Sequence, residues 1–224
     1  MIAERLANVR DAIARAAEAA GRESSTVKLI GVTKKQPAAA AREAVEAGLA
    51  DLGENYAQEL RDKARLVDGA RWHFIGMLQR NKTKYVVGVA HLIHTVDSPS
   101  LAEEVARRAA AMGIVQRCLI QVNVGDEAQK AGCAIDQLPS LVDAIAALPS
   151  LALDGLMCIP PAVDAEAARP FFRKLAELAR AERERTGRAL AELSMGMSAD
   201  FAVAVAEGAT LLRVGTAIFG ERPV

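Results

Sequence analysis

Two adjacent lysines end an apolar run in the stretch LIGVTKKQP, residues 29–37. Either Lys34 or Lys35 could be an ordinary exposed lysine, a contact for a phosphate, or the amine of a Schiff base with a carbonyl ligand. The last role needs an amine with a lowered pKa in a partly desolvated place. Apolar residues occur on both parities of the run, so the pattern does not distinguish the two lysines.

Two later stretches carry small and hydroxyl-bearing residues of the kind that bind anions. GMSAD contains Ser198, and VGTAIFG contains Gly215 and Thr216. Each stretch runs from an apolar segment into an expected helix start, where free backbone N–H groups and a hydroxyl favour a phosphate. Either hydroxyl alone could be an ordinary helix cap. The two together favour a phosphate site.

Arg213 interrupts the apolar segment TLLRVGT. An unpaired buried charge is costly, so this arginine needs either an ion pair with a carboxylate such as Glu54 or a ligand that it faces. Its positive charge would also depress the pKa of a nearby lysine. A lysine and a phosphate cradle in one site indicate an aldehyde phosphate, for which pyridoxal phosphate is the candidate.

The histidines and cysteines predict neither a metal site nor a disulfide framework. His91 and His94 lie three positions apart without a third ligand in the pattern, and His73 is interpreted as a core or rim residue. The three cysteines are scattered and form no CxxC pair. We interpret them as core residues, with Cys158 nearest to the rim.

These residues need a scaffold, and the chain alternates between strand and helix patterns throughout. Expected strands lie near residues 27–33, 50–55, 72–76, 92–96, 116–124, 151–159, 191–197 and 210–216. Helical patterns separate them, including one through residues 78–88, and an amphipathic helix precedes the first strand. Eight such units predict a (β/α)8 TIM barrel with an extra N-terminal helix. An open doubly wound sheet is the alternative, although no GxGxxG turn follows the first strand.

A barrel of this kind carries its site where the carboxyl ends of the strands meet. We therefore expect one rim to collect the polar and small residues that end the strands, namely Thr33, Lys34, Lys35, Glu54, Asn55, Tyr56, His73, Gly76, Asn123, Ser194, Ser198, Arg213, Gly215 and Thr216. No linker or low-complexity tract divides the sequence, so residues 1–224 are expected to form a single domain.

The composition argues against several classes of partner. The 224 residues include 28 Lys and Arg against 28 Asp and Glu, which gives no net charge to attract nucleic acid or an anionic membrane. The aromatic content of 4% also argues against platforms for base stacking. No signal-peptide core and no apolar run of membrane-spanning length occur. A soluble, cytoplasmic protein is expected.

The sequence as a whole closely resembles the pyridoxal phosphate homeostasis proteins, relatives of the barrel domain of alanine racemase. The resemblance runs from end to end and is carried by VTKKQP, LGENYAQE, WHFIGMLQRNK, VDS, QVNVGDEAQKAG, GLMCIPP and SMGMSADFAVAVAEGATLLRVGTAIFG. It implies a fold-type III barrel that binds pyridoxal 5'-phosphate (PLP) as a Schiff base on Lys34.

The resemblance also implies the remaining site residues. Arg213 is expected to face the pyridine nitrogen. A pocket-lining amide and a set of phosphate ligands are implied at Asn55 and at Ser198, Gly215 and Thr216. The sequence departs from many members at Gln36, where they carry a second lysine, which puts any role of that lysine in doubt. Lys130 matches a lysine of the family.

The function implied by the resemblance is homeostasis of PLP inside the cell, with PLP-dependent apo-enzymes as partners and no established catalytic turnover. The related racemases take a tyrosine acid/base group from a second domain on a partner subunit, and the sequence ends after its eighth unit. We therefore expect a monomer without efficient racemisation. A weak PLP-dependent amino-acid racemase and a sugar-phosphate barrel enzyme with a Schiff-base lysine remain as alternatives.

Overall fold

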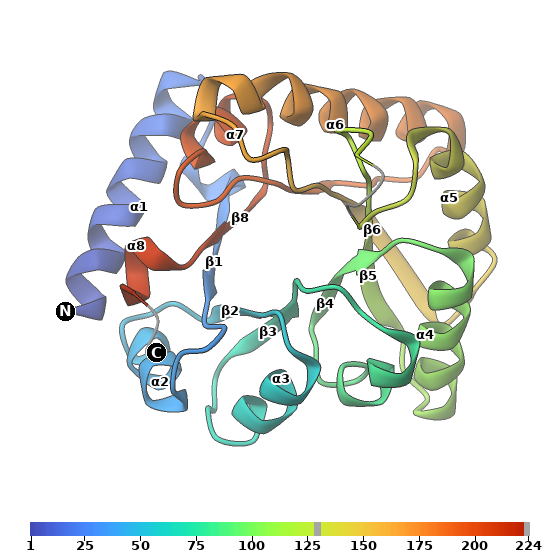
Figure 1. Ribbon diagram of the computed structural model, residues 1–224, viewed down its shortest axis with the longest axis horizontal. Helices are drawn as coiled ribbons and strands as arrows, with labels where there is room; N and C mark the ends of the chain where they lie inside the picture. The colour runs from blue at the N-terminus through green and yellow to red at the C-terminus, as the bar shows by residue number, and fades with distance from the viewer. Residues whose placement is uncertain (128–130, 222–224) are drawn as a thin grey trace.

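Eight parallel strands close into a barrel in the order in which they occur in the sequence (Figure 1). The computed structural model describes residues 1–127 and 131–221. The strands are β1 (Lys28–Val32), β2 (Asp51–Glu54), β3 (Arg71–Phe74), β4 (Leu92–Val96), β5 (Gln116–Gln121), β6 (Leu151–Met157), β7 (Glu192–Ser194) and β8 (Leu211–Val214). The ring closes where β1 pairs with β8, which confirms the predicted (β/α)8 barrel.

Helices cover the outside of the barrel (Figure 1). The α-helices are α1 (Ile2–Ala19), α2 (Ala38–Glu46), α3 (Ala57–Ala64), α4 (Pro99–Ala111), α5 (Leu138–Ala146), α6 (Ala165–Thr186), α7 (Phe201–Ala206) and α8 (Thr216–Phe219). Short 3₁₀-helices are η1 (Ser24–Thr26), η2 (Arg80–Tyr85) and η3 (Ile135–Gln137). Within the described residues, no helix has both the length and the apolar character needed to cross a bilayer.

The α-helix expected through residues 78–88 is wrong in type, because this connection forms the 3₁₀-helix η2. Of its six residues, RNKTKY, only Thr83 is buried. They offer no apolar stripe that could hold an α-helix against the barrel, and most helical stability in proteins comes from such packing.

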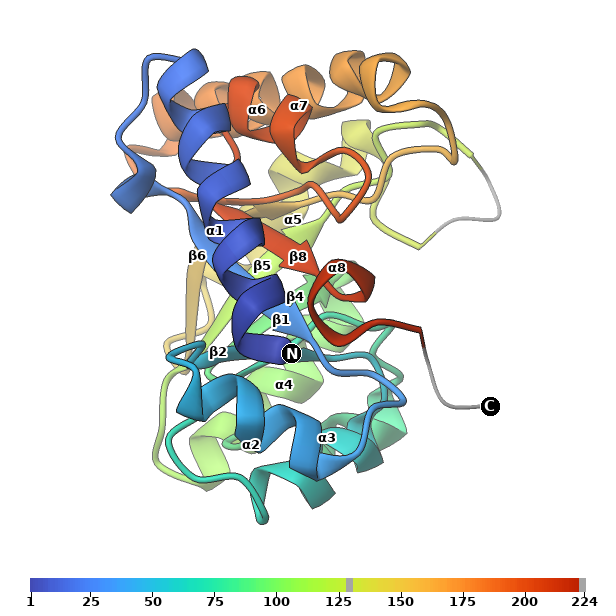
Figure 2. The same cartoon turned by 90° about the vertical axis from the view of Figure 1, so that its left-hand side faces the viewer.

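The extra helix α1 covers the seam where β8 meets β1, and it packs beside α7, α8 and α2 (Figure 2). Its buried residues recur every three or four positions, at Ile2, Leu6, Val9, Ile13 and Ala17. This spacing gives α1 one apolar face toward the barrel. Arg22, shortly after α1, donates through Nη1 to the carbonyl of Val205 at 2.7 Å and so ties this end of the chain to α7.

The apolar side chains form two separate sets. One fills the layer between strands and helices, and the other lies inside the barrel and consists of Ile30, Leu92, Leu119, Met157 and Leu211. The buried polar residues His73, His94 and Ser194 lie on the barrel strands as well. Buried polar groups must find hydrogen-bond partners, so these side chains are expected to satisfy one another.

Of the two positions considered for His73, the core position is confirmed and the rim position is wrong. His73 lies within β3 beside Gly53 of β2 and Leu92 of β4, and it is buried. Its Nε2 lies 3.0 Å from Oδ1 of Asp51, the first residue of β2. Because β3 begins only two residues earlier, at Arg71, the ring of His73 reaches the amino end of the barrel instead of the rim.

Candidate functional site

A pocket of about 270 Å³ opens at the carboxyl ends of the strands, and all six predicted site residues line it. These are Lys34, Asn55, Ser198, Arg213, Gly215 and Thr216. The rest of the wall is largely apolar and is made by Val32, Ile75, Ile159, Met197 and Ala199. A mainly apolar pocket with a few converging polar groups is typical of a site for a small molecule.

The structure separates the two lysines that the sequence pattern could not distinguish. Both lie in the turn between β1 and α2. Lys34 is half-buried and lines the pocket, whereas Lys35 is exposed and does not. Lys35 adopts a φ of 60°, in the left-handed region, and its N–H donates to Oε1 of Glu59 at 2.8 Å. The geometry therefore makes Lys34 the amine that a ligand in this pocket would meet.

A buried ionic cluster holds the turn that carries Lys34. Lys63 donates through Nζ to the carbonyl of Thr33 at 2.6 Å, and to Oε1 of Glu54 and Oε1 of Glu59 at 2.7 Å each. The hydroxyl of Thr33 donates to Glu54 at 2.6 Å. The residues before and after Lys34 are thus both bound to this cluster, Thr33 directly and Lys35 through Glu59. The cluster fixes the backbone from which Lys34 reaches the pocket.

Glu54 is fully buried, and burial raises the pKa of its carboxyl above the usual value. The hydrogen bonds from Lys63 and Thr33 act in the opposite direction and stabilise the ionised form. Glu54 Oε2 has no hydrogen-bond partner among the described residues. The carboxylate therefore depends on Lys63 for its compensation.

Lys63 was missed at the level of sequence, although its spacing contains a signal. It follows Leu60 by three positions and precedes Val67 by four, so it falls on the apolar face of its helix. A lysine on such a face needs a buried partner.

Asn55 presents an unsatisfied acceptor. Its Oδ1 is buried and has no hydrogen-bond partner in the part of the chain that the structure describes. A Cβ added to Gly76, two residues after β3, would lie 2.1 Å from the carbonyl oxygen of Asn55, so only glycine allows this close approach. An orphaned buried acceptor on a pocket wall is suited to a donor from a ligand or a water molecule.

Arg213 is 4% exposed, and burial lowers the pKa of its guanidinium. Of the two partners considered from the sequence, Glu54 is not used. Nη1 donates to Oγ of Ser194 at 2.7 Å and Nη2 donates to the carbonyl of Cys158 at 2.9 Å. Both acceptors are neutral, and no carboxylate within the described ranges forms an ion pair with Arg213. A buried cation on a pocket wall is suited to an electron-rich ligand atom.

The predicted anion ligands lie at the connections that follow β7 and β8. Ser198 is in the turn before α7, Gly215 is the N-cap of α8, and Thr216 is its first residue. The first backbone N–H groups of a helix have no intrahelical acceptor, so they add donors beside these hydroxyls. A Cβ on Gly215 would lie 3.3 Å from the carbonyl oxygen of Val32, which explains a glycine in this crowded place.

Other residues noted in the sequence lie apart from the pocket wall. Asn123 donates through Nδ2 to the carbonyl of Glu127 at 2.9 Å and so stabilises its own loop. Gln36 is buried, and its Nε2 lies 3.4 Å from the carbonyl oxygen of Glu221. Cys158 is buried, and burial raises the pKa of its thiol to about 12. Lys130 lies outside the described residues.

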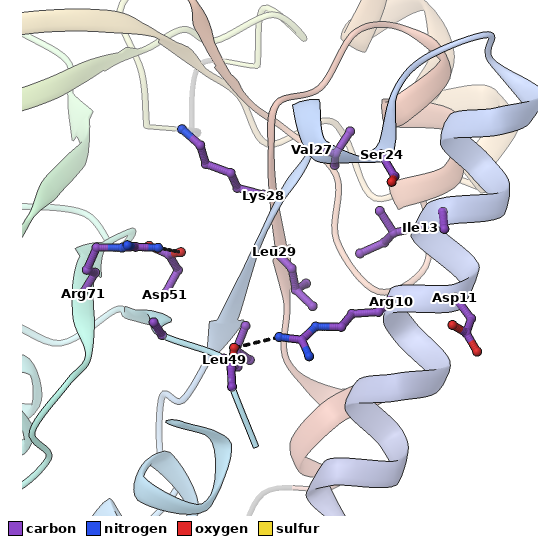
Figure 3. A pocket seen from close by; sticks show the side chains of 13 residues that line it. Arg10, Asp11, Ile13, Ser24, Val27, Lys28, Leu29, Leu49, Asp51 and Arg71 are labelled. Atoms are coloured by element: carbon purple, nitrogen blue, oxygen red, sulfur yellow. Dashed lines mark hydrogen bonds and ion pairs between the residues drawn. The ribbon is translucent and has the colours of Figure 1, made fainter. Parts of the chain in front are cut away.

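A larger hollow, of about 440 Å³, lies at the opposite end of the barrel, between α1 and the first residues of β1, β2 and β3 (Figure 3). Its cations already have partners. Arg10 donates to the carbonyl of Gly48 at 2.7 Å, and Arg71 pairs with the carboxylate of Asp51 at 2.6 Å. Lys28 pairs with Glu192 on the barrel side. The smaller pocket at the carboxyl ends is therefore the better candidate for chemistry.

Comparisons with known proteins identify the family of the chain. Residues 5–223 match the family model described as alanine racemase, N-terminal domain. A pyridoxal phosphate homeostasis protein of Aquifex aeolicus is 45% identical over 222 residues, covering 98% of this chain and 97% of that protein. The protein of the same name from Pseudomonas aeruginosa is 46% identical over 225 residues, with 99% and 96% covered.

One similar solved structure is that of PipY from Synechococcus elongatus, described as having PLP bound. It is 36% identical in sequence, with a TM-score of 0.87, and the match covers 98% of this chain and 100% of that one.

Replacing Lys63 should expose the dependence of the site on the ionic cluster. Lys63→Met leaves the carboxylate of Glu54 buried without its cation, and breaking such a pair costs about 3–5 kcal/mol. We expect a loss of this size in the free energy of unfolding, measured by urea denaturation. Lys35→Met, at an exposed lysine two residues from Thr33, is the control and should change it by less than about 0.5 kcal/mol.

The double variant Glu54→Gln/Lys63→Met removes both charges and should recover part of the loss. Equal losses for Lys63→Met and Lys35→Met would contradict the role assigned to the cluster.

Proposed function

The chain belongs to the pyridoxal phosphate homeostasis proteins, within the family of the alanine racemase N-terminal domain, and we propose that it binds PLP and acts in the homeostasis of this cofactor. The name of the curated relatives and the bound PLP in the similar structure of PipY support the proposal. The single observation that carries it is the convergence of an amine, a guanidinium, an unsatisfied amide oxygen and two hydroxyls on one pocket.

The residues of the pocket fit the parts of PLP. When bound, PLP supplies an aldehyde that condenses reversibly with an amine and a pyridine ring that withdraws electrons. In our proposal, Lys34 provides the amine of the Schiff base, and Arg213 donates to the pyridine nitrogen. The orphaned Oδ1 of Asn55 accepts a hydrogen bond from the hydroxyl group of the ring. The phosphate is held by Ser198 and Thr216 and by the backbone at Gly215.

Arg213 also bears on what the protein does with the cofactor. A guanidinium keeps its protons, so it donates to the pyridine nitrogen without protonating it. An unprotonated ring is a weaker electron sink than one paired with a carboxylic acid. Among the described residues that line the pocket, Lys34 and Arg213 are the ones with titratable side chains, and neither tyrosine is among them. This chemistry favours holding PLP over transforming an amino acid with it.

The proposal includes PLP-dependent apo-enzymes as recipients, a cytoplasmic location and a monomeric protein. Cys118, Cys133 and Cys158 are buried and free, as expected for a protein in a reducing compartment.

Replacement of each lysine in turn tests which of them supplies the amine. Lys34→Ala should abolish the visible absorbance band of the PLP-loaded protein, and Lys35→Ala should retain it, because only Lys34 lines the pocket. Borohydride reduction followed by peptide mapping should place the pyridoxyl group on Lys34. Finding the group on Lys35 would refute the assignment.

Replacement of both hydroxyls tests the phosphate ligands. Hydrogen bonds to a charged group are worth about 1.5–3 kcal/mol each, so Ser198→Ala/Thr216→Ala should weaken PLP binding by tenfold or more for each lost bond, as an order of magnitude. Unphosphorylated pyridoxal is the control ligand, and its affinity should change little. Equal losses for the two ligands in titrations would contradict a phosphate cradle at these residues.

Amino-acid turnover separates the carrier proposal from a racemase. Efficient racemisation needs an acid/base group on each face of the substrate, and each missing group typically costs about 10²–10⁴-fold in rate. We expect negligible racemisation of L-alanine by the loaded protein in deuterated water. Chiral chromatography of the alanine measures the racemisation. A turnover of about 1–10³ per second, ordinary for enzymes, would restore the racemase alternative.

A further inference from the structure

A chain of polar side chains crosses the barrel from the pocket to the opposite mouth. Arg213 Nη1 lies 2.7 Å from Ser194 Oγ, and Ser194 Oγ lies 2.8 Å from His94 Nδ1. His94 Nε2 lies 3.0 Å from His73 Nδ1, and His73 Nε2 lies 3.0 Å from Asp51 Oδ1. These residues come from five different strands, β8, β7, β4, β3 and β2.

The two ends of the chain lie in different surroundings. Arg213 lines the pocket at the carboxyl ends of the strands. Asp51 lines the hollow at the amino ends, where Figure 3 shows its carboxylate against the guanidinium of Arg71. The links between them are buried, with His94 and Ser194 fully so. The chain therefore connects the candidate site with a surface that no ligand of the site would touch.

The hydrogen bonds of this chain have one consistent direction. Arginine only donates and a carboxylate only accepts, so the ends are fixed. Asp51 is a carboxylate: burial acts to raise its pKa, but the hydrogen bonds from Arg71 and His73 outweigh burial and hold the pKa well below its usual value. With a neutral His73, hydrogen bonding then requires His73 to donate through Nε2 to Asp51, His94 to donate through Nε2 to His73, and the Ser194 hydroxyl to donate to His94.

The opposite direction fails at Asp51. If His94 donated to Ser194 through Nδ1, its Nε2 would have to accept from Nδ1 of His73. A neutral His73 would then turn its bare Nε2 toward the Asp51 carboxylate, with two acceptors 3.0 Å apart. His94 itself is neutral, because burial, and to a lesser degree the charge of Arg213, holds the pKa of its ring well below the usual value.

We propose that Asp51, at the far mouth of the barrel, is a positioning residue for the cofactor site, because it fixes the direction of this chain and thereby orients and polarises the acceptor of Arg213. The part of the proposal that concerns PLP rests on the proposed function. Each donor in the chain points toward Asp51, so Ser194 directs its proton away from Arg213 and its lone pairs toward it. Hydrogen bonds in such chains strengthen one another.

This arrangement explains how a buried arginine is held without a carboxylate beside it. Arg213 has two neutral acceptors, and one of them is the first member of a chain that ends on an anion. A direct ion pair would draw the guanidinium away from the pocket. The chain supplies part of the compensation from a distance and leaves the remaining N–H groups of Arg213 for a ligand.

The proposal predicts the protonation of each ring nitrogen, which nitrogen NMR of imidazoles measures in the protein without ligand. The sequence contains only three histidines, so their signals are readily assigned. We expect protons on Nε2 of His73 and His94. His91 is an internal reference that should carry its proton on Nδ1. Its Nε2 lies 2.6 Å from Nη1 of Arg117, which can only donate, so Nε2 must accept. A proton on Nδ1 of His94, or a doubly protonated His73, would overturn the proposal.

Two variants at the far mouth separate the chain from the ion pair. The asparagine side chain in Asp51→Asn can donate as well as accept. His73 and His94 should therefore no longer carry their protons on Nε2 alone, and both tautomers should be populated. Arg71→Gln removes the neighbouring ion pair, leaves the carboxylate in place and should retain that form. Retention in Asp51→Asn would overturn the proposal. Should Asp51→Asn fail to fold, the nitrogen signals of the unaltered protein decide by themselves.

The loaded protein gives a second readout. Asp51→Asn should weaken PLP binding by about two- to fivefold, as expected for losing a fraction of one charge-assisted hydrogen bond, whereas Arg71→Gln should not. Equal affinities for the two variants would refute the link to the cofactor. If the unaltered protein bound no PLP, the proposed function would fail, while the protonation of the histidines would still test the chain.

Discussion

The closure of eight parallel strands into one ring is the constraint on which the rest of the structure depends. Since all strands run in the same direction, every connection that follows a strand reaches the same mouth. Lys34 after the first strand and Thr216 after the last therefore line one pocket, although they come from opposite ends of the sequence. The same closure confines the polar side chains that point inward, so His73, His94 and Ser194 are each other's partners.

Two buried cations are compensated in different ways, and the difference corresponds to their tasks. Lys63 is in direct contact with the carboxylates of Glu54 and Glu59, and its charge is consumed in holding a turn. Arg213 contacts a hydroxyl and a carbonyl, and it faces a pocket. A cation paired with a carboxylate is fixed in place, and its charge is largely neutralised. A cation held by neutral acceptors keeps its positive charge largely unneutralised, so it can attract an electron-rich group of a ligand in the pocket.

The parts of the structure that sequence could predict are those determined by local pattern. Alternating strand and helix signals predicted the barrel, and residues at strand ends predicted the pocket wall. Periodicity could not separate Lys34 from Lys35, because that choice depends on a left-handed residue and on Glu59, which belongs to a later helix. The partner of Arg213 was also beyond reach, since Glu54 and Ser194 are equally plausible until register and inward direction are known.

The helix α1 and the tie between Arg22 and Val205 have a consequence for how the chain folds. That hydrogen bond spans 183 positions, and the seam beneath it joins the first strand to the last. Contacts of such long range are slow to form, because an intervening loop must lose its freedom before any contact repays it. During synthesis α1 emerges well before α7 and α8, against which it packs. Much of its apolar face therefore stays uncovered until those elements have been made, which leaves this helix open to chaperones and to mispairing with a neighbouring nascent chain.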